Sequence, residues 1–267
     1  MFFLTLMELC LINAQCSSLI TYITPRNIRS NSVDRMVKTQ RESWPMKKIA
    51  LLGKGKTGSK VLEFGSQDIT VFDSKNPPEL EILKKHDVII SFLPGGSFKK
   101  YIPLLLESKI PVVTGSTGFE WPKDLNKKLK ENNLTWIKSS NFGLGMAIIK
   151  SILPLIGKCD SLFDDYALNL HEIHHVNKKD APSGTALSWK DWIGLDVSIT
   201  SERKGDEVGT HSLSLVTPFE EISIKHRALD RKIFAQGALW AAEKVMNEKL
   251  PFGLIDFQEL ILRRDLK

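Results

Sequence analysis

The chain has 267 residues, of which 42% are hydrophobic and 25% charged, the composition of an ordinary globular protein. That balance excludes collagen-like, mucin-like and wholly disordered chains, and the length fits one large domain or two moderate ones. The net charge of +6 suits an anionic small substrate or a phosphate-bearing cofactor. Because no cluster of Lys and Arg is interleaved with aromatic residues, we expect no nucleic-acid partner.

Cysteine usage indicates a reduced compartment. The three cysteines, Cys10, Cys16 and Cys159, form no C-x-x-C motif, and their number is not the even number that a framework of disulfides requires. This pattern is typical of an intracellular chain without a cysteine-built metal site, so we expect a cytoplasmic protein.

Residues 1–45 differ from the rest of the chain. The opening MFFLTLMELCLINA is apolar, but it is shorter than the roughly 20 residues that span a bilayer and no basic segment precedes it. We therefore expect neither a membrane partner nor a secretory signal. Residues 17–45 are rich in Ser, Thr, Asn and Arg without periodicity, which predicts disorder. Two interpretations stay open: an organelle-targeting peptide, or a translation start that lies at Met46, which we favour.

A nucleotide-binding pattern follows directly. An apolar strand is predicted at Lys48–Leu52 and a helix at 59–64, and the intervening GKGKTG fits G-x-G-x-x-G. Glycines allow a tight turn and close backbone approach, and the amides that open a helix attract a pyrophosphate. The cofactor-binding candidates in this loop are Gly53, Gly55, Lys56, Thr57 and Gly58.

The choice of dinucleotide depends on the end of the next strand. The strand predicted at Asp68–Phe72 leads into Asp73, 20 positions after Gly53. An acid there is placed to bind the ribose hydroxyls of NADH. Lys75 lies near enough to accept the 2′-phosphate of NADPH, so both cofactors stay open.

Strand and helix continue to alternate. Apolar runs typical of buried parallel strands lie within 87–94, 110–119 and 134–145, separated by helical patterns at 98–108 and 122–132. This order predicts a Rossmann-like, doubly wound parallel sheet, in which ligands bind beyond the carboxyl ends of the strands. The further cofactor-binding candidates at these ends are Phe92, Gly115, Ser116, Thr117, Ser139, Ser140, Asn141 and Phe142.

After residue 142 the pattern changes to that of an α+β domain. Alternating strands are predicted at 166–175 and in an antiparallel hairpin within 210–228, with a helix after Pro182. The segments 235–247 and 253–262 are expected to pack back on the first domain. We therefore expect a dinucleotide-binding domain at 46–142, completed by 236–267, and a substrate-binding and oligomerisation domain at 143–235.

Residues 174–186, HHVNKKDAPSGTA, are dense in chemically useful groups. Adjacent residues of a strand point to opposite faces, so His174 and His175 share one pocket only if the strand ends there. Lys178 lies in the following loop, and the helix start at 182–185 offers amides to a carboxylate. This combination indicates an acidic substrate that must be protonated. The histidines could instead be packed or surface residues, and with His171 they lack the spacing of a metal site, so no metal is expected.

These motifs resemble those of the dihydrodipicolinate reductase (4-hydroxy-tetrahydrodipicolinate reductase) family, and the resemblance covers residues 46–267. HHVNKKDAPSGTA is similar to the family signature, GSTGF at 115–119 to its GTTGF, and SSNFGLG at 139–145 to its ANFS-type loop. KGDEVGTH at 204–211, FAQGAL at 234–239 and GLIDFQELI at 253–261 fit the family in the same order.

The resemblance implies a homotetrameric NAD(P)H-dependent reductase of lysine and diaminopimelate biosynthesis. It would convert 4-hydroxy-tetrahydrodipicolinate to 2,3,4,5-tetrahydrodipicolinate. Carried over by position, His174 is the acid/base residue and Lys178 the proton donor or charge partner. His175, Gly184 and Thr185 are implied to contact the substrate carboxylates.

Three departures from the family pattern lie on the cofactor side. The glycine loop is one residue shorter and has Lys56-Thr57 in place of Arg-Met, Lys75 replaces an Arg, and SFLP replaces DFTxP. The cofactor preference therefore stays open. Two other functions are alternatives: a two-domain dehydrogenase acting on an amino acid, against which the PSGT helix start and the paired histidines argue, and a dinucleotide sensor without catalysis, which would lack His174 and Lys178.

Overall fold

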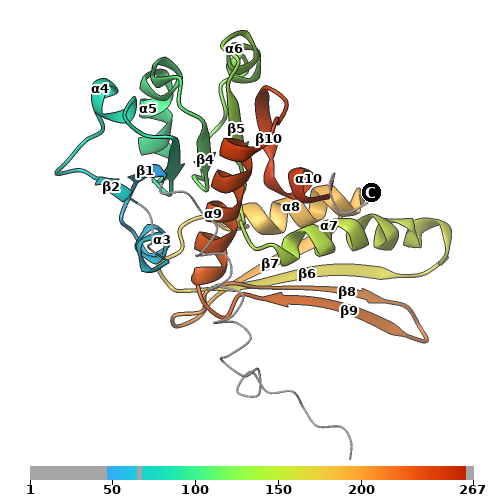
Figure 1. Ribbon diagram of the computed structural model, residues 1–267. Helices are drawn as coiled ribbons and strands as arrows, with labels where there is room; N and C mark the ends of the chain where they lie inside the picture. Colours follow the sequence, from blue (N-terminus) through green and yellow to red (C-terminus); the bar gives the residue numbers. More distant parts are fainter. Residues whose placement is uncertain (1–46, 65–67, 263–267) are drawn as a thin grey trace, which may run out of the picture. The chain divides into compact units, whose positions relative to one another are not determined.

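The computed structural model describes residues 47–64 and 68–262. Both interpretations of residues 1–45 lie outside the described part. The described residues form two β-sheets with helices packed on them (Figure 1).

The first sheet contains six parallel strands in the order β10-β5-β4-β3-β1-β2. Strands β1, β3 and β4 are almost entirely buried, as expected for a sheet covered on both faces. The predicted doubly wound parallel sheet is thus confirmed. Its strands are β1 (Lys48–Leu52), β2 (Asp68–Phe72), β3 (Val88–Ser91), β4 (Val112–Thr114), β5 (Thr135–Lys138) and β10 (Gly253–Asp256).

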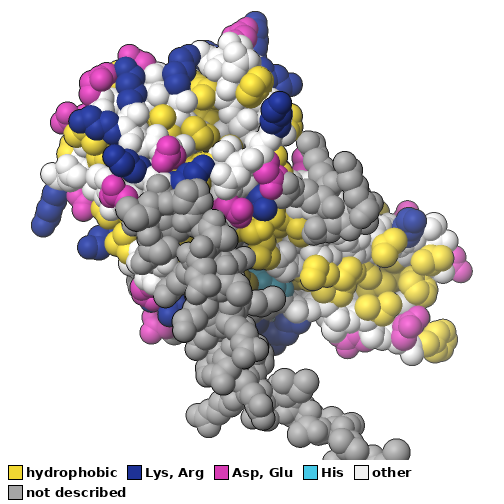
Figure 2. Space-filling model, in the orientation of Figure 1, with side chains coloured by type: hydrophobic (Ala, Val, Ile, Leu, Met, Phe, Trp, Pro, Cys, Tyr) yellow, Lys and Arg dark blue, Asp and Glu magenta, His cyan; other side chains and the backbone are white. Residues whose placement is uncertain are grey.

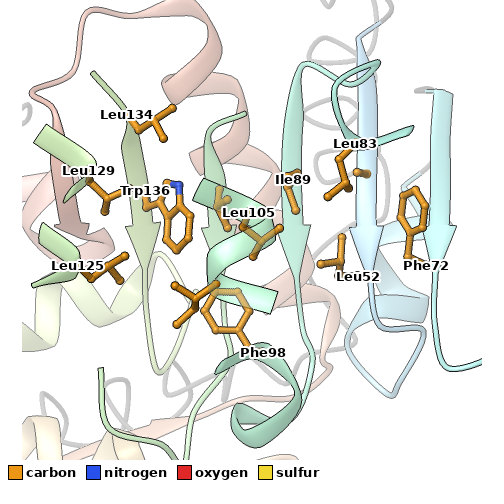
Figure 3. Packing of buried hydrophobic residues seen from close by; sticks show 13 residues of the cluster. Leu52, Phe72, Leu83, Ile89, Phe98, Leu105, Leu125, Leu129, Leu134 and Trp136 are labelled. Carbon is orange, nitrogen blue, oxygen red and sulfur yellow. The ribbon is translucent and has the colours of Figure 1, made fainter. Parts of the chain in front are cut away.

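Helices cover both faces of this sheet. On one face, α5 (Gly95–Ser108) inserts Phe98 and Leu105 among side chains of the strands, including Trp136 (Figure 3). The shorter helices α4 (Leu80–Leu83) and α6 (Leu125–Glu131) complete that layer. On the other face, α9 (Lys232–Asn247) contacts β3, β4 and the short helix α3 (Gly58–Glu63).

The second sheet is mixed and has four strands in the order β7-β6-β8-β9. Strands β6 and β7 are parallel, whereas β8 pairs antiparallel with both β6 and β9, which confirms the predicted hairpin. The strands are β6 (Ala167–His174), β7 (Ser198–Arg203), β8 (Thr210–Val216) and β9 (Glu221–Arg227).

One face of the second sheet packs on helices. Strand β6 is connected to β7 through α8 (Gly184–Ile193). Helix α7 (Gly145–Ile156) packs on α8 and is followed in the chain by a short 3₁₀ turn, η2 (Gly157–Ser161). Leu170, Leu213 and Trp189 lie at the centre of the resulting core. Because inward and outward residues alternate along β6, the same face carries Leu168, Glu172 and His174.

The carboxyl-terminal segment adds a strand to the first sheet. Strand β10 pairs with β5, and α10 (Phe257–Leu262) contacts α7. Figure 1 shows α9 alongside the first sheet, with its amino-terminal end near the second sheet. Helix α9 begins at Lys232, three residues before the predicted start.

No helix within the described ranges is long and apolar enough to cross a membrane.

Candidate active site

The glycine loop is held together by close backbone contacts. It follows β1 at the point where the strand order reverses between β1 and β3, the usual ligand position in such sheets. Gly53 has a φ of +94°, which favours glycine, and its N–H donates to the carbonyl of Phe72. A methyl group on Gly58 would lie 1.9 Å from the carbonyl oxygen of Gly53. Glycine is therefore required where α3 begins.

A cleft lies beyond this loop. Gly55 faces open space, and the cleft combines backbone amides with a lysine, which are groups suited to phosphates. The predicted cofactor residues that line it are Gly55, Lys56, Thr57, Phe92, Gly115 and Thr117.

Other cofactor candidates support the loops or lie elsewhere. The hydroxyl of Ser116 lies 3.4 Å from that of Ser91, and the side-chain amide of Gln258 donates a hydrogen bond to the hydroxyl of Ser139. Phe142 packs on other aromatic rings. These buried side chains, like Gly53 and Gly58, do not line the cleft.

Asp73 also lies outside this cleft. Its Oδ1 accepts the backbone N–H groups of Lys75 and Asn76, which hold the pKa of the carboxyl below its ordinary value. Asp73 therefore stabilises the turn after β2 as an anion, and its contact with a ribose stays a prediction.

A second cleft contains the predicted substrate residues. It meets the first cleft at Thr117, His175 and Arg231. The predicted site residues that line it are Thr117, Ser140, Asn141, His174, His175, Lys178, Gly184 and Thr185. Residues that are distant in sequence therefore converge on one pair of joined clefts.

Both histidines face the cleft because the strand ends between them. Strand β6 stops at His174, and His175 begins the following turn, so the alternation of faces no longer applies. His171 lies on the opposite face of the strand, where it bonds Thr200 and is 43% exposed.

Glu172 is a buried acid directly behind the cleft. It is 0% exposed, accepts the Ser201 hydroxyl at 2.8 Å, and has Nδ1 of His174 and Nε2 of His211 each 3.6 Å from its Oε2. Burial acts to raise the pKa of Glu172, but its contacts with His211, Ser183 and Ser201 outweigh burial and hold the pKa well below the ordinary value. Glu172 is therefore an anion at neutral pH.

His174 is neutral in the free protein. Burial, followed by the charge of His211, lowers its pKa to about 4, although Glu172 acts in the opposite direction. With Nδ1 facing Glu172, Nε2 lies beside Gly209, where an added methyl group would be only 3.1 Å away. The absence of a side chain at Gly209 gives this ring its room.

Lys178 is held by a neighbouring acid. Its Nζ lies 2.8 Å and 2.9 Å from the two carboxylate oxygens of Asp180. Arg203 in turn donates to the carbonyls of Lys178 and Asp180 and lies 3.6 Å from Glu172. The loop that carries Lys178 is therefore fixed to the buried acid.

The start of α8 offers an anion-binding end. Ser183 caps the helix by accepting the N–H of Ala186 at 3.2 Å, and its hydroxyl also lies 3.2 Å from Nε2 of His211. Gly184 and Thr185 follow at the cleft, where the free amides and positive dipole end of a helix favour a carboxylate.

Sequence reasoning missed three residues of this network. Glu172 fits the strand pattern and gave no separate signal, and Arg203 belongs to β7, which was not predicted. His211 lay in the recognised KGDEVGTH segment, but only strand pairing places it opposite Glu172. The donor atoms of Glu172, His174 and His211 lie within 4.8 Å of one another, a spacing that a metal ion could bridge. The spacing of the histidines in the sequence does not by itself predict that Glu172, His174 and His211 lie together.

A dinucleotide-type sheet joined to a lobe bearing an acid/base cluster defines a two-lobed oxidoreductase. The family model "Dihydrodipicolinate reductase, C-terminus" matches residues 147–261. The chain belongs to the 4-hydroxy-tetrahydrodipicolinate reductase family, whose members are NAD(P)H-dependent enzymes. The resemblance seen in the motifs is confirmed.

Curated relatives and a solved structure agree. The reductase of Thermosipho africanus is 33% identical over 78% of this chain and 94% of its own length. That of Xylella fastidiosa is 34% identical over 69% of this chain and 77% of its own. A structure described as dipicolinate-bound dihydrodipicolinate reductase from Paenisporosarcina sp. TG-14 covers 81% of this chain and 100% of its own at 20% identity, with a TM-score of 0.60. That structure shows the shared fold.

Proposed function

We propose that the protein reduces 4-hydroxy-tetrahydrodipicolinate to 2,3,4,5-tetrahydrodipicolinate. A hydride from NAD(P)H and a proton are added, and one water leaves, so the reaction balances. The observation that carries this proposal is the junction of the two clefts, where the acid/base cluster meets the glycine-loop side of the sheet. Family membership supplies the substrate name.

The chain's own residues would position the substrate and move the proton. Gly184 and Thr185 bind a carboxylate at the start of α8, and His175 contributes from the other side of the cleft. His174 exchanges a proton through Nε2 while Glu172 faces Nδ1, and Lys178 supplies the nearby charge or proton. The bound dinucleotide supplies the hydride.

For the cofactor, we propose that Asp73 favours NADH and that Lys75 permits NADPH. The two residues sit in one turn after β2, where the Asp73 carboxylate accepts the Lys75 N–H at 2.8 Å. Lys75→Ala is expected to raise the KM for NADPH and leave that for NADH unchanged. Equal effects on both would remove Lys75 from this role.

We also propose a homotetramer that works in the cytoplasm, assembled through the lobe at 143–235. The helices α7 and α8 pack on one face of the second sheet, and Asn169 and His171 lie on the other face. Hydrophobic side chains also gather on the surface of this lobe (Figure 2). Ile148 and Leu155 on α7 are 65% and 61% exposed. Light scattering would test the assembly, and a monomer would contradict it.

The test of the reaction couples the full chain to the synthase that condenses pyruvate and aspartate semialdehyde. Oxidation of NADH and of NADPH is followed separately. Synthase-dependent oxidation is expected with at least one cofactor. A folded protein that binds dinucleotide but oxidises none would favour a sensor or a different substrate.

A further inference from the structure

Three buried side chains of the second lobe converge on a single point. Glu172, His174 and His211 are 0%, 7% and 2% exposed. Pairing of β6 with β8 places Glu172 opposite His211, so groups that are far apart in the sequence come together. One nitrogen or oxygen atom from each residue lies within 4.8 Å of the other two, and residues 47–64 and 68–262 contain no second cluster of this kind.

The two oxygens of Glu172 have different surroundings. Both accept the N–H of Ser183, and Oε1 also accepts the hydroxyl of Ser201 at 2.8 Å. Oε2 instead faces Nδ1 of His174 and Nε2 of His211, each at 3.6 Å. These two separations exceed the length of an ordinary hydrogen bond. Nδ1 of His174 is buried and has no hydrogen-bond partner in the part of the chain that the structure describes, so this nitrogen is left for a further ligand.

The spacing of these atoms fits a zinc ion. Bonds of roughly 2.0–2.2 Å at tetrahedral angles place the ligand atoms of zinc about 3.3 Å apart, so separations of 3.6 Å require only small shifts. Nε2 of His211 would exchange its 3.2 Å contact with the Ser183 hydroxyl for the ion. Both histidines line the second cleft, which offers an entry path and a fourth position for water.

We propose that Glu172, His174 and His211 form an inhibitory site for Zn²⁺. Two imidazoles and one carboxylate favour Zn²⁺ over Mg²⁺, which prefers oxygen ligands. An imidazole bound to the ion through Nδ1 cannot take up a second proton, so His174 could no longer alternate between its neutral and protonated forms. Binding of the ion is independent of the reaction, and only its effect on turnover rests on the proposed function.

The first measurement is a calorimetric titration of the full-length protein, free of any histidine tag, with Zn²⁺ and separately with Mg²⁺. We expect Zn²⁺ to bind and Mg²⁺ not to bind. His174→Gln and His211→Gln should each weaken Zn²⁺ binding at least about 10- to 100-fold, because loss of a residue that merely supports a metal ligand already has an effect of that size. Retained binding of NADH verifies that each variant is folded.

His171→Gln is the matched control for these variants. His171 belongs to the same strand and lies 3.5 Å from an acid, Glu202, but both side chains are 43% exposed and outside the cluster. This variant should keep the wild-type Kd for Zn²⁺. An exposed pair of histidine and acid is thereby tested as a competing site for the ion.

The second measurement follows turnover with the synthase in excess, so that the synthase does not limit the rate. Zn²⁺ should lower the rate of the wild type and of His171→Gln at least about tenfold, since it blocks an acid/base group. Addition of EDTA should restore both rates. The same concentration of Mg²⁺ should leave them nearly unchanged.

Two results would overturn the inference. Unchanged Zn²⁺ binding in His174→Gln and His211→Gln would assign the ion to another part of the chain, and full turnover with Zn²⁺ bound would exclude inhibition. If the wild type turns over but binds no Zn²⁺, this inference fails and the proposed function stands. If it binds Zn²⁺ through these residues but reduces no substrate after EDTA treatment, the proposed function fails and the metal site stands.

Discussion

Both carboxylate oxygens of Glu172 accept the backbone N–H of Ser183, at 3.0 Å and 3.2 Å. Ser183 in turn caps α8, and Glu172 also accepts the hydroxyl of Ser201 on β7. One buried charge therefore holds the strand that carries His174 in register with the helix end proposed to bind a carboxylate.

Replacing this charge should destabilise the protein. Glu172→Gln replaces one carboxylate oxygen, which accepts hydrogen bonds, with an NH₂ group that faces the donors of its neighbours. It also leaves Arg203 without its buried counter-charge. We expect the free energy of unfolding to fall by about 1–3 kcal/mol, measured by urea denaturation. Glu202→Gln is the matched control, because Glu202 is 43% exposed on β7 and should change stability by less than about 0.5 kcal/mol. Equal effects would show that Glu172 has no special structural role.

Substitution of the proposed proton-transfer residues His174 and Lys178 should lower turnover, whereas substitution of another histidine of β6 should not. His174→Gln and Lys178→Ala are each expected to lower kcat by roughly 10²- to 10⁴-fold, the range for general acid–base groups. His171→Gln, on the opposite face of β6, should retain nearly full turnover. Steady-state rates with the synthase-coupled substrate measure all three, and near-normal rates for the first two variants would remove the mechanism.

The glycine loop offers a test on the cofactor side. A methyl group on Gly58 would lie 1.9 Å from the Gly53 carbonyl, so Gly58→Ala must displace the loop. We expect the KM for the dinucleotide to rise about tenfold or more, since small misplacements are costly. Gly96→Ala, whose added methyl group meets nothing within 4 Å, is the control. An unchanged cofactor KM in Gly58→Ala would show that the loop does not hold the dinucleotide.

Much of the fold could be predicted because many of its strands and helices are defined by a local pattern of apolar residues in the sequence. The strands Lys48–Leu52 and Asp68–Phe72 are found at their predicted bounds, since each is bounded by residues that break the apolar run. Strand β7 was missed because SITSER is largely polar and exposed. Helix α4 was missed because four residues give too little periodicity.

The site could be predicted only where its groups are adjacent in sequence. The segment that contains His174, His175 and Lys178 could be identified as a candidate site from the sequence alone. His211 reaches Glu172 only through the antiparallel register of β6 and β8, and Arg231 reaches the cleft from the start of α9. Such contacts depend on packing between distant segments, which no local pattern records.

The low pKa of His174 links stability to pH. Because the folded state holds this pKa near 4 against 6.5 for the unfolded chain, the unfolded state binds more protons between these values. The free energy of unfolding should therefore fall as the pH is lowered from about 6.5 towards 4. His175 and His226, whose pKa values burial also lowers, contribute in the same direction. His174→Gln should remove part of the slope.

Urea denaturation at several values between pH 5 and pH 7 would measure this effect. That window lies above the ordinary pKa of 4.5 for Glu172, whose own contribution is lost only at lower pH because its folded pKa is depressed. Parallel stability profiles for wild type and His174→Gln would mean that His174 is protonated equally in the folded and unfolded states, and the lowered pKa of His174 would be wrong.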